Sequence, residues 1–382
     1  MKRKLAIVTE IIAPYRIPVF NALAKRDDID LHVIFLAETD ETQRQWHVYK
    51  SEIKFSYQVL RSYRRRVGKY HSLLNLGMSR ALKQFSPDVI VCGGYNYVAS
   101  WTTLFWARRH TAALLLWVES TARDHRSKRR PVEFLKTWFM RQCQGFIVPG
   151  KSSFQYLRNY GINEKSIFTA PNAVDTDFFS HQAGIVRNEA AGLRERFNLP
   201  PHYFLFVGRL VAGKGVFDLL KAYMLQTHEF REEWGLVFVG NGPAISELKL
   251  RADGAKNVHF AGFAQREQLA VYYGLADVFV FPTHSDPWGL VVNEAMACSL
   301  PIIISEAAGC AEDLVQDGWN GFKFSTADVS KLTVLMKNIV GDTKRMHEMG
   351  QRSFQSIQHY SPEICADGIA EAAISQGINS ER

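Results

Sequence analysis

The fold of this chain is decided by the stretch Tyr203-Phe-Leu-Phe-Val-Gly-Arg-Leu-Val-Ala-Gly-Lys-Gly-Val-Phe-Asp-Leu-Leu220. Its first five residues, Tyr203–Val207, are apolar and predict a buried strand. A glycine-rich turn follows, and the apolar residues of Val216–Leu225 recur with the period of a helix. A strand, a tight turn and a helix in succession are typical of doubly wound α/β folds.

The same alternation of short apolar runs with amphipathic stretches continues in both directions, which predicts parallel sheets flanked by helices. The expected strands of the first half are Leu5–Thr9, Leu31–Phe35, Val89–Cys92, Ala113–Val118, Gly145–Val148 and Ile167–Ala170. Those of the second half are Tyr203–Val207, Gly235–Val239, Val258–Phe260, Val278–Phe281 and Pro301–Ser305. Expected helices include Pro18–Lys25, Leu73–Phe85, Val216–Leu225 and Arg266–Gly274.

A chain of 382 residues exceeds the size at which one hydrophobic core usually keeps growing. We therefore expect two Rossmann-like, doubly wound domains that face a central cleft. The first covers residues 1–180, and the second covers residues 181–360 after the polar stretch 180–201. Residues 361–382 are expected to form a C-terminal helix and tail. In such folds, ligands bind at the carboxyl ends of the strands.

The positive charge is concentrated in the first half of the chain. Residues 1–180 hold 28 Lys and Arg against 15 Asp and Glu, a net charge of +13, whereas residues 181–382 have a net charge of −5. The densest basic runs are Arg61–Tyr70 and Arg123–Arg130, and the apolar residues Phe134, Leu135, Trp138 and Phe139 follow the second run at helical spacing. The charges fit either an ordinary solvated surface or an anionic membrane surface. Nucleic acid is not expected as a partner, because no nucleic-acid-binding motif accompanies them.

The composition is that of a cytoplasmic protein, peripheral at most on the inner face of the cytoplasmic membrane. The first ten residues predict a strand rather than a signal peptide, and the longest apolar run, residues 112–118, is too short to cross a bilayer. The cysteines have neither disulfide-like nor zinc-like spacing and are expected to be buried free thiols; they are Cys92, Cys143, Cys298, Cys310 and Cys365.

Asp286 and Glu294 flank the turn Pro287-Trp288-Gly289 and the start of a helix-like run. This arrangement brings two carboxylates close to unpaired backbone N–H groups at a helix N-terminus. The N–H groups and the positive helix end suit a phosphate, and the carboxylates suit vicinal hydroxyls. A ligand that carries both is a sugar nucleotide.

Arg209 and Lys214 lie in the turn after the strand Tyr203–Val207, where they can neutralise a diphosphate. A positively charged surface loop is the alternative. Gly208 starts this turn, and Gly240 and Gly242 follow the next strand, where their backbone can approach a nucleobase or ribose. The second pair begins like the dinucleotide motif G-x-G-x-x-G, but the third glycine position is not a glycine, so a dehydrogenase is not favoured.

Further candidates lie at other strand ends. Glu119 follows a buried strand, where an active-site role and a helix-capping role are both open. Tyr15 and Arg16 lie after the first strand, and Gly94 lies after the third, all on the side expected to bind the acceptor. The D-x-D pairs Asp28/Asp30 and Asp175/Asp177 could hold a metal, but a structural role is favoured. We therefore expect no metal and no cofactor.

Together these segments resemble the retaining GT-B glycosyltransferases of glycosyltransferase family 4, as found in bacterial surface-polysaccharide synthesis. The matching motifs are Ala13–Phe20, Pro171–Asp175, Val207–Leu210 with Lys214-Gly215, Val239–Gly242, Val258–Gly262, Ala276–Pro282, Asp286–Glu294 and Asp317–Phe322. The family has two glutamates that flank seven residues, and the first is Asp286 here. Many relatives carry a histidine in the region where this chain has Glu119.

The resemblance implies a role for each matching residue. Glu294 would hold the nucleotide ribose and Asp286 the sugar hydroxyls. Gly289, Leu290 and Val291 would offer backbone N–H groups, while Gly262 and Phe263 would line the base pocket. Arg209 and Lys214 would stabilise the leaving diphosphate.

The expected activity is transfer of a sugar from a nucleoside-diphosphate sugar to a glycan or a polyprenyl-phosphate-linked saccharide, with retention of the anomeric configuration. The alternatives are a sugar-nucleotide epimerase or phosphorylase on the same fold, and a catalytically silent sugar-nucleotide-binding protein.

Overall fold

A computed structural model describes residues 2–40, 45–67, 70–123 and 130–376. These residues divide into two compact units, residues 1–173 with 362–382 and residues 174–361. The sequence placed the division after residue 180. The first helix of the second unit, α6 (Thr176–Asn188), begins before that point and packs on α11 (Arg266–Leu275) of the same unit.

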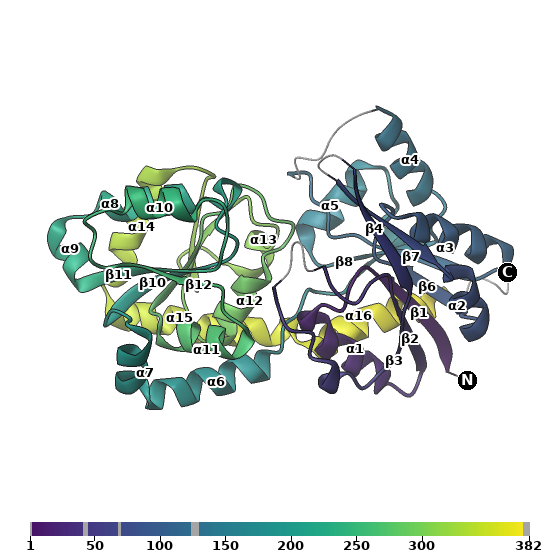
Figure 1. Cartoon of the computed structure of the whole chain (residues 1–382), viewed down its shortest axis with the longest axis horizontal. Helices are drawn as coiled ribbons and strands as arrows, with labels where there is room; N and C mark the ends of the chain where they lie inside the picture. Colours follow the sequence, from purple (N-terminus) through teal and green to yellow (C-terminus); the bar gives the residue numbers. More distant parts are fainter. Residues whose placement is uncertain (1, 41–44, 68–69, 124–129, 377–382) are drawn as a thin grey trace. The chain divides into compact units, whose positions relative to one another are not determined.

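The first unit is built on a parallel sheet of seven strands in the order β3-β2-β1-β6-β7-β8-β9 (Figure 1). The strands are β1 Arg3–Thr9, β2 Ile29–Phe35, β3 Ser56–Val59, β6 Val89–Cys92, β7 Ala113–Trp117, β8 Gly145–Val148 and β9 Ile167–Thr169. Its helices are α1 Ile17–Ala24, α2 Met78–Phe85, α3 Val98–Arg109, α4 Arg130–Met140, α5 Lys151–Asn159 and α16 Pro362–Ser375. Leu5 and Ile7 of β1 belong to the core on one face of the sheet, and Ala6 and Val8 belong to the core on the other. This two-sided burial explains why the strand is apolar without interruption.

The second unit repeats this plan with a six-stranded parallel sheet in the order β12-β11-β10-β13-β14-β15. The strands are β10 His202–Val207, β11 Trp234–Val239, β12 Val258–Gly262, β13 Val278–Phe281, β14 Ile302–Ser305 and β15 Gly321–Phe324. Besides α6 and α11, the helices are α7 Ala190–Phe197, α8 Val216–Met224, α9 His228–Glu233, α10 Ile245–Arg251, α12 Leu290–Ala297, α13 Ala311–Leu314, α14 Val329–Val340 and α15 Thr343–Ile357. The predicted α/β fold with two Rossmann-like units is therefore confirmed.

One element differs from the sequence prediction, and one stretch for which no element was predicted is helical. The predicted helix Leu73–Phe85 is wrong in its first part, because Leu73–Leu76 belong to β5 (Tyr70–Leu76), which pairs antiparallel with β4 (Arg61–Val67). Leu73 is buried whereas Leu74 and Leu76 are exposed, and the helix begins only after Gly77. The polar stretch 180–201 is mainly helical, since α6 and α7 cover it.

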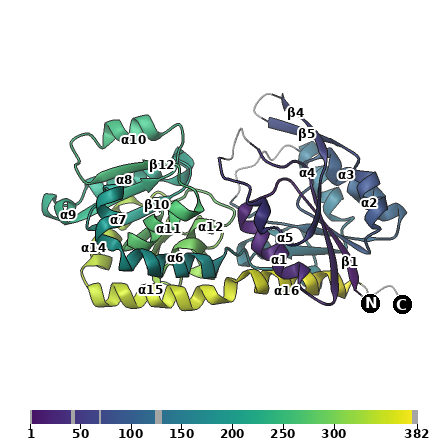
Figure 2. The same cartoon turned by 60° about the horizontal axis from the view of Figure 1, so that its bottom comes forward.

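The C-terminal helix α16 belongs to the first unit. It lies along α1, as Figure 2 shows, and it also packs against β9. Cys365, Ile369, Ala370 and Ala373 are completely buried on it and join the core beside β1. The predicted helix from Pro362 is therefore confirmed, and the tail from residue 377 lies outside the described residues.

Candidate functional site

In each sheet the strand order reverses at one central strand. The strands that follow it directly in the chain lie on one side of it, and the later strands lie on the other side. In the second unit this strand is β10, which lies between β11 and β13, so the topological switch point falls between β10 and β13. Loops at the carboxyl ends of such strands form the ligand crevice in open α/β sheets. The loops after β10 and β13 are 208–215 and 282–289, and they carry five residues of the predicted site, which are Gly208, Arg209, Lys214, Asp286 and Gly289.

The loop after β10 holds two cations in different environments. Arg209 is exposed, and within the described part of the chain its guanidinium makes no hydrogen bond or ion pair. Lys214 is only partly exposed, and its Nζ lies 2.5 Å from Asp286 Oδ2. The structure thus brings Lys214 and Asp286 together and leaves Arg209 available to a ligand.

Asp286 is held in place by backbone contacts. Its Oδ1 accepts a hydrogen bond from the Trp288 N–H at 3.0 Å, and its carbonyl oxygen accepts one from Gly309 at 2.9 Å. The loop after β14 therefore supports the loop after β13. Among the described residues, the remaining polar contact of the Asp286 carboxylate is the ion pair with Lys214, which a bound diphosphate would share.

Two residues that the sequence analysis missed connect the loops after β10 and β13. His284 Nε2 lies 2.6 Å from Asp218 Oδ2 in the first turn of α8, and the His284 N–H donates to the Gly213 carbonyl at 3.0 Å. The buried Thr283 hydroxyl lies 3.3 Å from the same carbonyl. No local sequence signal relates residues 66 to 71 positions apart, so these contacts become visible only in the folded chain.

The helix α12 begins directly after the loop that carries Asp286. Its N-cap is Gly289, which has a φ of +100°, and a Cβ added there would lie 2.7 Å from Phe281 Cε1. Glycine is thus required for both the conformation and the space. The first N–H groups of a helix have no intrahelical acceptor, so Leu290 and Val291 present theirs at this end of the helix.

Glu294 lies one turn further along α12 in a mostly apolar environment. Its Oε2 accepts a hydrogen bond of 2.7 Å from the Tyr273 hydroxyl of α11. Burial raises the pKa of Glu294 to about 7, although the hydrogen bond from Tyr273 opposes this shift. Tyr273 is a further residue that sequence reasoning missed, because no motif singles it out.

The three neighbouring strands β10, β11 and β12 end in glycines that approach one another. The Gly208 N–H donates to the Val239 carbonyl at 3.0 Å, and the Gly240 N–H donates to the Gly262 carbonyl at 2.7 Å. A Cβ on Gly240 would lie 1.9 Å from the Gly208 carbonyl oxygen, so no larger residue fits without a shift of the backbone. A Cβ on Gly242 would meet the Leu210 carbonyl oxygen in the same way. Phe263 follows β12 with 39% of its surface exposed.

In the first unit, the predicted residues Arg16 and Glu119 form an ion pair with each other. Arg16 follows β1 and Glu119 follows β7, and the Arg16 guanidinium also lies 4.1 Å from the centre of the Trp117 ring. Tyr15 packs edge-on against Trp46, and the Gly94 carbonyl accepts a hydrogen bond from Cys92 Sγ. The Glu119 carboxylate is therefore paired with the Arg16 guanidinium at the carboxyl end of the first sheet.

The D-x-D pairs have structural partners. Asp175 is the N-cap of α6, where its Oδ1 accepts from the Phe178 N–H at 2.9 Å. Asp28 is paired with Arg26 at 2.7 Å. Across the described residues, no group of three or more His, Cys, Asp or Glu side chains is placed to hold a metal ion.

The predicted apolar stripe of α4 is only partly exposed. Phe134 and Leu135 are 69% and 50% exposed, but Phe139 is buried and Trp138 stacks on Trp101 of α3. The stripe prediction is thus wrong for Phe139, which is buried in the core of the first unit, while Trp138 is partly covered by Trp101. Residues 124–129 of the basic run lie outside the described residues. No helix within the described ranges is both long enough and apolar enough to cross a bilayer.

Comparisons with known families match both units. Residues 19–178 match the family model described as Glycosyltransferase Family 4, and residues 193–356 match the model described as Glycosyl transferases group 1.

Two curated proteins illustrate the similarity in sequence. The chain is 27% identical over 290 residues to a GDP-mannose-dependent alpha-mannosyltransferase of Corynebacterium glutamicum, a match that covers 74% of this chain and 66% of that protein. It is 31% identical over 176 residues to the sulfoquinovosyl transferase SQD2 of Arabidopsis thaliana, which covers 46% of this chain and 33% of that protein. The chain thus spans from about a third to about two thirds of the length of these relatives.

Solved structures share the fold over the full length. The Anabaena protein Alr3699/HepE, solved in complex with UDP, superposes with a TM-score of 0.76 at 17% identity and covers 98% of this chain and 100% of its own. Sucrose-phosphate synthase of Thermosynechococcus elongatus superposes with a TM-score of 0.75 at 18% identity, with 100% of both chains covered. One glycosyltransferase family model thus matches each unit, and the chain shares the GT-B fold of two Rossmann-like units.

Proposed function

We propose that the protein is a retaining glycosyltransferase that moves a sugar from a nucleoside-diphosphate sugar to a glycan or a polyprenyl-phosphate-linked saccharide. One observation carries the proposal. At the switch point of the second unit, the unpaired Arg209, the amine of Lys214 and the N-terminus of α12 all lie in loops at the carboxyl edge of the same sheet. This concentration of positive charge suits a diphosphate, and Asp286 and Glu294 beside it suit hydroxyl groups.

The same groups account for the chemistry of transfer. Negative charge grows on the diphosphate as the glycosidic bond breaks, and fixed cations and dipoles stabilise that charge more in the transition state than in the ground state. The Lys214–Asp286 ion pair connects the two ends of the donor, because Lys214 would contact the phosphates while Asp286 contacts the sugar. We infer that the leaving phosphate accepts the proton of the acceptor hydroxyl on the same face of the sugar, which gives retention.

The relatives support a nucleotide-sugar donor without deciding the base. The similar enzyme of Corynebacterium glutamicum is named as GDP-mannose-dependent, and the Anabaena protein was solved with UDP and with UDP-glucose. Both bases therefore belong in the first experiment.

The proposal is tested by incubating the protein with UDP- and GDP-sugars and with polyprenyl-phosphate-linked saccharide acceptors. We expect sugar transfer to one acceptor, and an anomeric configuration equal to that of the donor when the product is analysed by NMR. An inverted product would contradict retention. Conversion without an acceptor would indicate an epimerase, turnover with inorganic phosphate would indicate a phosphorylase, and binding without any turnover would indicate a silent binding protein.

The roles of the two carboxylates can be separated. Glu294→Gln should weaken the affinity for plain nucleoside diphosphate, whereas Asp286→Asn should lower kcat more than that affinity. Calorimetry with UDP and GDP gives the affinity, and steady-state kinetics with the full donor gives kcat. Small and equal effects in both variants would contradict this division of roles.

We propose that transfer needs no metal ion, because Arg209, Lys214 and the backbone dipoles of α12 neutralise the diphosphate. Activity should persist in EDTA. Complete loss in EDTA that manganese or magnesium restores would instead support a metal role for Asp175 and Asp177.

We further propose that the first unit binds the inner face of the cytoplasmic membrane, where a lipid-linked acceptor would lie. Phe134 and Leu135 are exposed on α4, and the half of the chain that contains them has a net charge of +13. Each basic residue near an anionic surface contributes about 1 kcal/mol to binding, so a cluster of four or five holds a protein reversibly.

Vesicle co-sedimentation tests the membrane proposal. Binding to anionic vesicles should exceed binding to neutral vesicles and should weaken with salt. Two changes should lower it, the pair Phe134→Ser with Leu135→Ser, and the replacement of Lys128, Arg129 and Arg130 by Ser. Leu250→Ser is the matched control, since Leu250 is an exposed leucine of the second unit. Equal partition to both kinds of vesicle would leave these charges as an ordinary solvated surface.

A further inference from the structure

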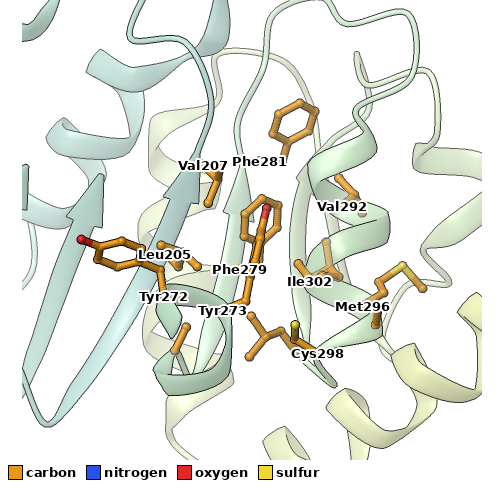
Figure 3. Close-up of a cluster of buried hydrophobic side chains, with 14 of the residues drawn as sticks. Leu205, Val207, Tyr272, Tyr273, Phe279, Phe281, Val292, Met296, Cys298 and Ile302 are labelled. Atoms are coloured by element: carbon orange, nitrogen blue, oxygen red, sulfur yellow. The ribbon is translucent and has the colours of Figure 1, made fainter. Parts of the chain in front are cut away.

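Tyr273 is a completely buried tyrosine whose hydroxyl reaches the donor side of the second unit. Its ring packs edge-on against Phe179 of α6 at 5.9 Å between centroids, and it lies 5.9 Å from the Phe279 ring of β13. Figure 3 shows the ring of Tyr273 beside that of Phe279, while the ring of the neighbouring Tyr272, which belongs to the same apolar cluster, points away from Phe279. The backbone and the packed rings fix the position of the hydroxyl.

The Tyr273 hydroxyl donates a hydrogen bond to one of the two carboxylate oxygens of Glu294. The Tyr273 Oη lies 2.7 Å from Glu294 Oε2 and 3.3 Å from the Val291 carbonyl oxygen, which belongs to the first turn of α12. Among the described residues, no donor is bonded to Glu294 Oε1. The carboxylate is therefore oriented by one oxygen and offers the other.

We propose that Tyr273 is the positioning residue of the donor site, whose hydroxyl holds Glu294 Oε2 so that Oε1 receives the ribose hydroxyls of the nucleotide. This inference rests on the proposed function, because it assumes that Glu294 binds the ribose. Tyr273 itself touches no substrate and acts through Glu294.

Because the surroundings of Glu294 are apolar, the hydrogen bond from Tyr273 has a strong influence on whether the Glu294 carboxyl group is ionised. Burial raises the pKa of Glu294 to about 7, and the Tyr273 hydroxyl is the group that counteracts the shift. On the other sides, the packed elements contribute apolar residues to this cluster, which are Phe279 and Phe281 of β13, Ile302 and Ile304 of β14, and Phe354 and Ile357 of α15. The other titratable or charged groups nearby are Cys298, one turn along α12, and Arg187 of α6, which bonds the Cys298 carbonyl.

Calorimetric titration of the full chain with UDP and with GDP between pH 6 and pH 9 tests the inference. For the nucleotide that binds, the affinity of the wild type should rise with pH through a midpoint near 7, as Glu294 loses its proton. Tyr273→Phe removes only the hydroxyl and should move this midpoint upward by about one pH unit. The affinity at pH 7 should then fall about fivefold, and the difference from wild type should narrow at pH 9.

Three matched variants make the result specific. Tyr272→Phe is the control for removal of a tyrosine hydroxyl from the same helix, since the Tyr272 hydroxyl makes no hydrogen bond within the described chain, and it should bind like the wild type. Glu294→Gln has no titratable group at this position, so the pH dependence of its affinity shows the contribution of the nucleotide itself. In the Glu294→Gln background, Tyr273→Phe should have no additional effect, because Tyr273 acts through that carboxylate.

The outcomes distinguish the inference from the proposed function. If the wild type binds neither nucleotide, the proposed function fails. If the wild type binds and Tyr273→Phe leaves both affinity and midpoint unchanged, the positioning role is wrong. If Tyr273→Phe weakens nucleotide binding equally at every pH and equally in the Glu294→Gln background, the tyrosine has a structural role only. The melting temperature of each variant is measured as well, and an unchanged value shows that a loss of affinity is not caused by misfolding.

Discussion

Arg209 is an exposed arginine whose backbone position is set by the fold, although its guanidinium forms no hydrogen bond or ion pair with the described residues. It follows β10 at the switch point, and no described acidic group neutralises it. An arginine that pairs with nothing can be removed without leaving a buried partner behind. Its effect on binding can therefore be measured apart from its effect on folding.

Arg209→Ala should lower kcat/KM for the donor about 10- to 100-fold, because a hydrogen bond to a charged group contributes about 1.5–3 kcal/mol. The melting temperature should stay unchanged. Lys249→Ala removes the same charge from the exposed side of the same unit and should keep full activity. If Arg209→Ala and Lys249→Ala behaved alike, the phosphate role of Arg209 would be wrong.

Glu294 lowers the stability of the protein at neutral pH. Its pKa of about 7 in the folded chain lies above the ordinary value of 4.5. Stability from this group is therefore fully present below about pH 4.5 and is lost as the pH rises through 7. Once the pH is well above 7, the full pKa shift of Glu294 contributes, and the loss in the free energy of unfolding is on the order of 3 kcal/mol.

Glu294→Gln should accordingly be more stable than the wild type at pH 8 and should lose most of that advantage at pH 5. Urea unfolding of both proteins at the two pH values measures the difference. Glu247→Gln, at an exposed glutamate of α10, should show no such dependence. A Glu294→Gln variant that is less stable than the wild type at pH 8 would contradict the raised pKa.

At this scale the sequence indicates which residues lie at the strand ends but not which of them touch. Arg209, Lys214, Asp286 and Glu294 all occur in recognisable local patterns. The contacts Arg16–Glu119, Asp218–His284 and Tyr273–Glu294 join residues far apart in the chain, and each depends on strand order and helix packing. A tyrosine in an apolar helix gives no local sign that its hydroxyl serves a carboxylate on another helix.

Among the elements, α12 has the closest link between sequence and function. Its start is fixed by Gly289, which leaves the helix end open to a ligand instead of closing it with a capping side chain. A serine or aspartate at this position would satisfy the first N–H groups and compete with a phosphate for them.

Gly289→Ala should therefore damage both folding and binding. The added Cβ would meet the Phe281 ring at 2.7 Å in a backbone conformation that alanine rarely adopts. A loss of about 1–3 kcal/mol in stability and a weaker affinity for nucleoside diphosphate are expected. Gly213→Ala, at a neighbouring turn with open space and an ordinary φ, is the control and should be tolerated. Equal melting temperatures for the two variants would contradict the steric argument.

The helix Leu73–Phe85 was predicted wrongly in its first part, and the helices of residues 180–201 were not predicted. In Leu73–Phe85, the leucines at 73, 74 and 76 together with Leu82 mimic a helical period, although the first part is a strand whose side chains alternate between core and solvent. Strand pairing with β4 decides this case, and pairing is a property of the folded chain. In α6, residues 176–188, the buried positions Phe179, Ala183 and Val186 follow a helical period within a stretch that is otherwise polar.

At the scale of the whole molecule, the two units are organised differently along the chain. The second unit is one continuous segment, residues 174–361, whereas the first is made of residues 1–173 and the returning helix α16. Sequence predicted two units and the last helix, but not the unit to which that helix belongs. An amphipathic or apolar helix shows that it will be buried, without showing against which surface.

Residues 174–361 should fold alone and show cooperative thermal unfolding by circular dichroism. Residues 1–173 should aggregate, because they lack the helix that covers α1 and β9. Joining residues 362–376 to this fragment through a long Gly/Ser linker should restore a soluble, cooperatively folding unit. A fragment 1–173 that folds as well without α16 as with it would contradict the packing described for that helix.

The discontinuous first unit also has a consequence for synthesis in the cell. A ribosome completes residues 1–173 early, but α16 emerges only after all of residues 174–361 have been made. At the usual rates of elongation this interval is roughly 10 to 40 seconds. During that time the nascent chain carries an uncovered apolar surface formed around Leu5, Ile7 and Ala170. We therefore expect the later half of the chain to reach its native state first, while the earlier half exposes this apolar surface until synthesis ends.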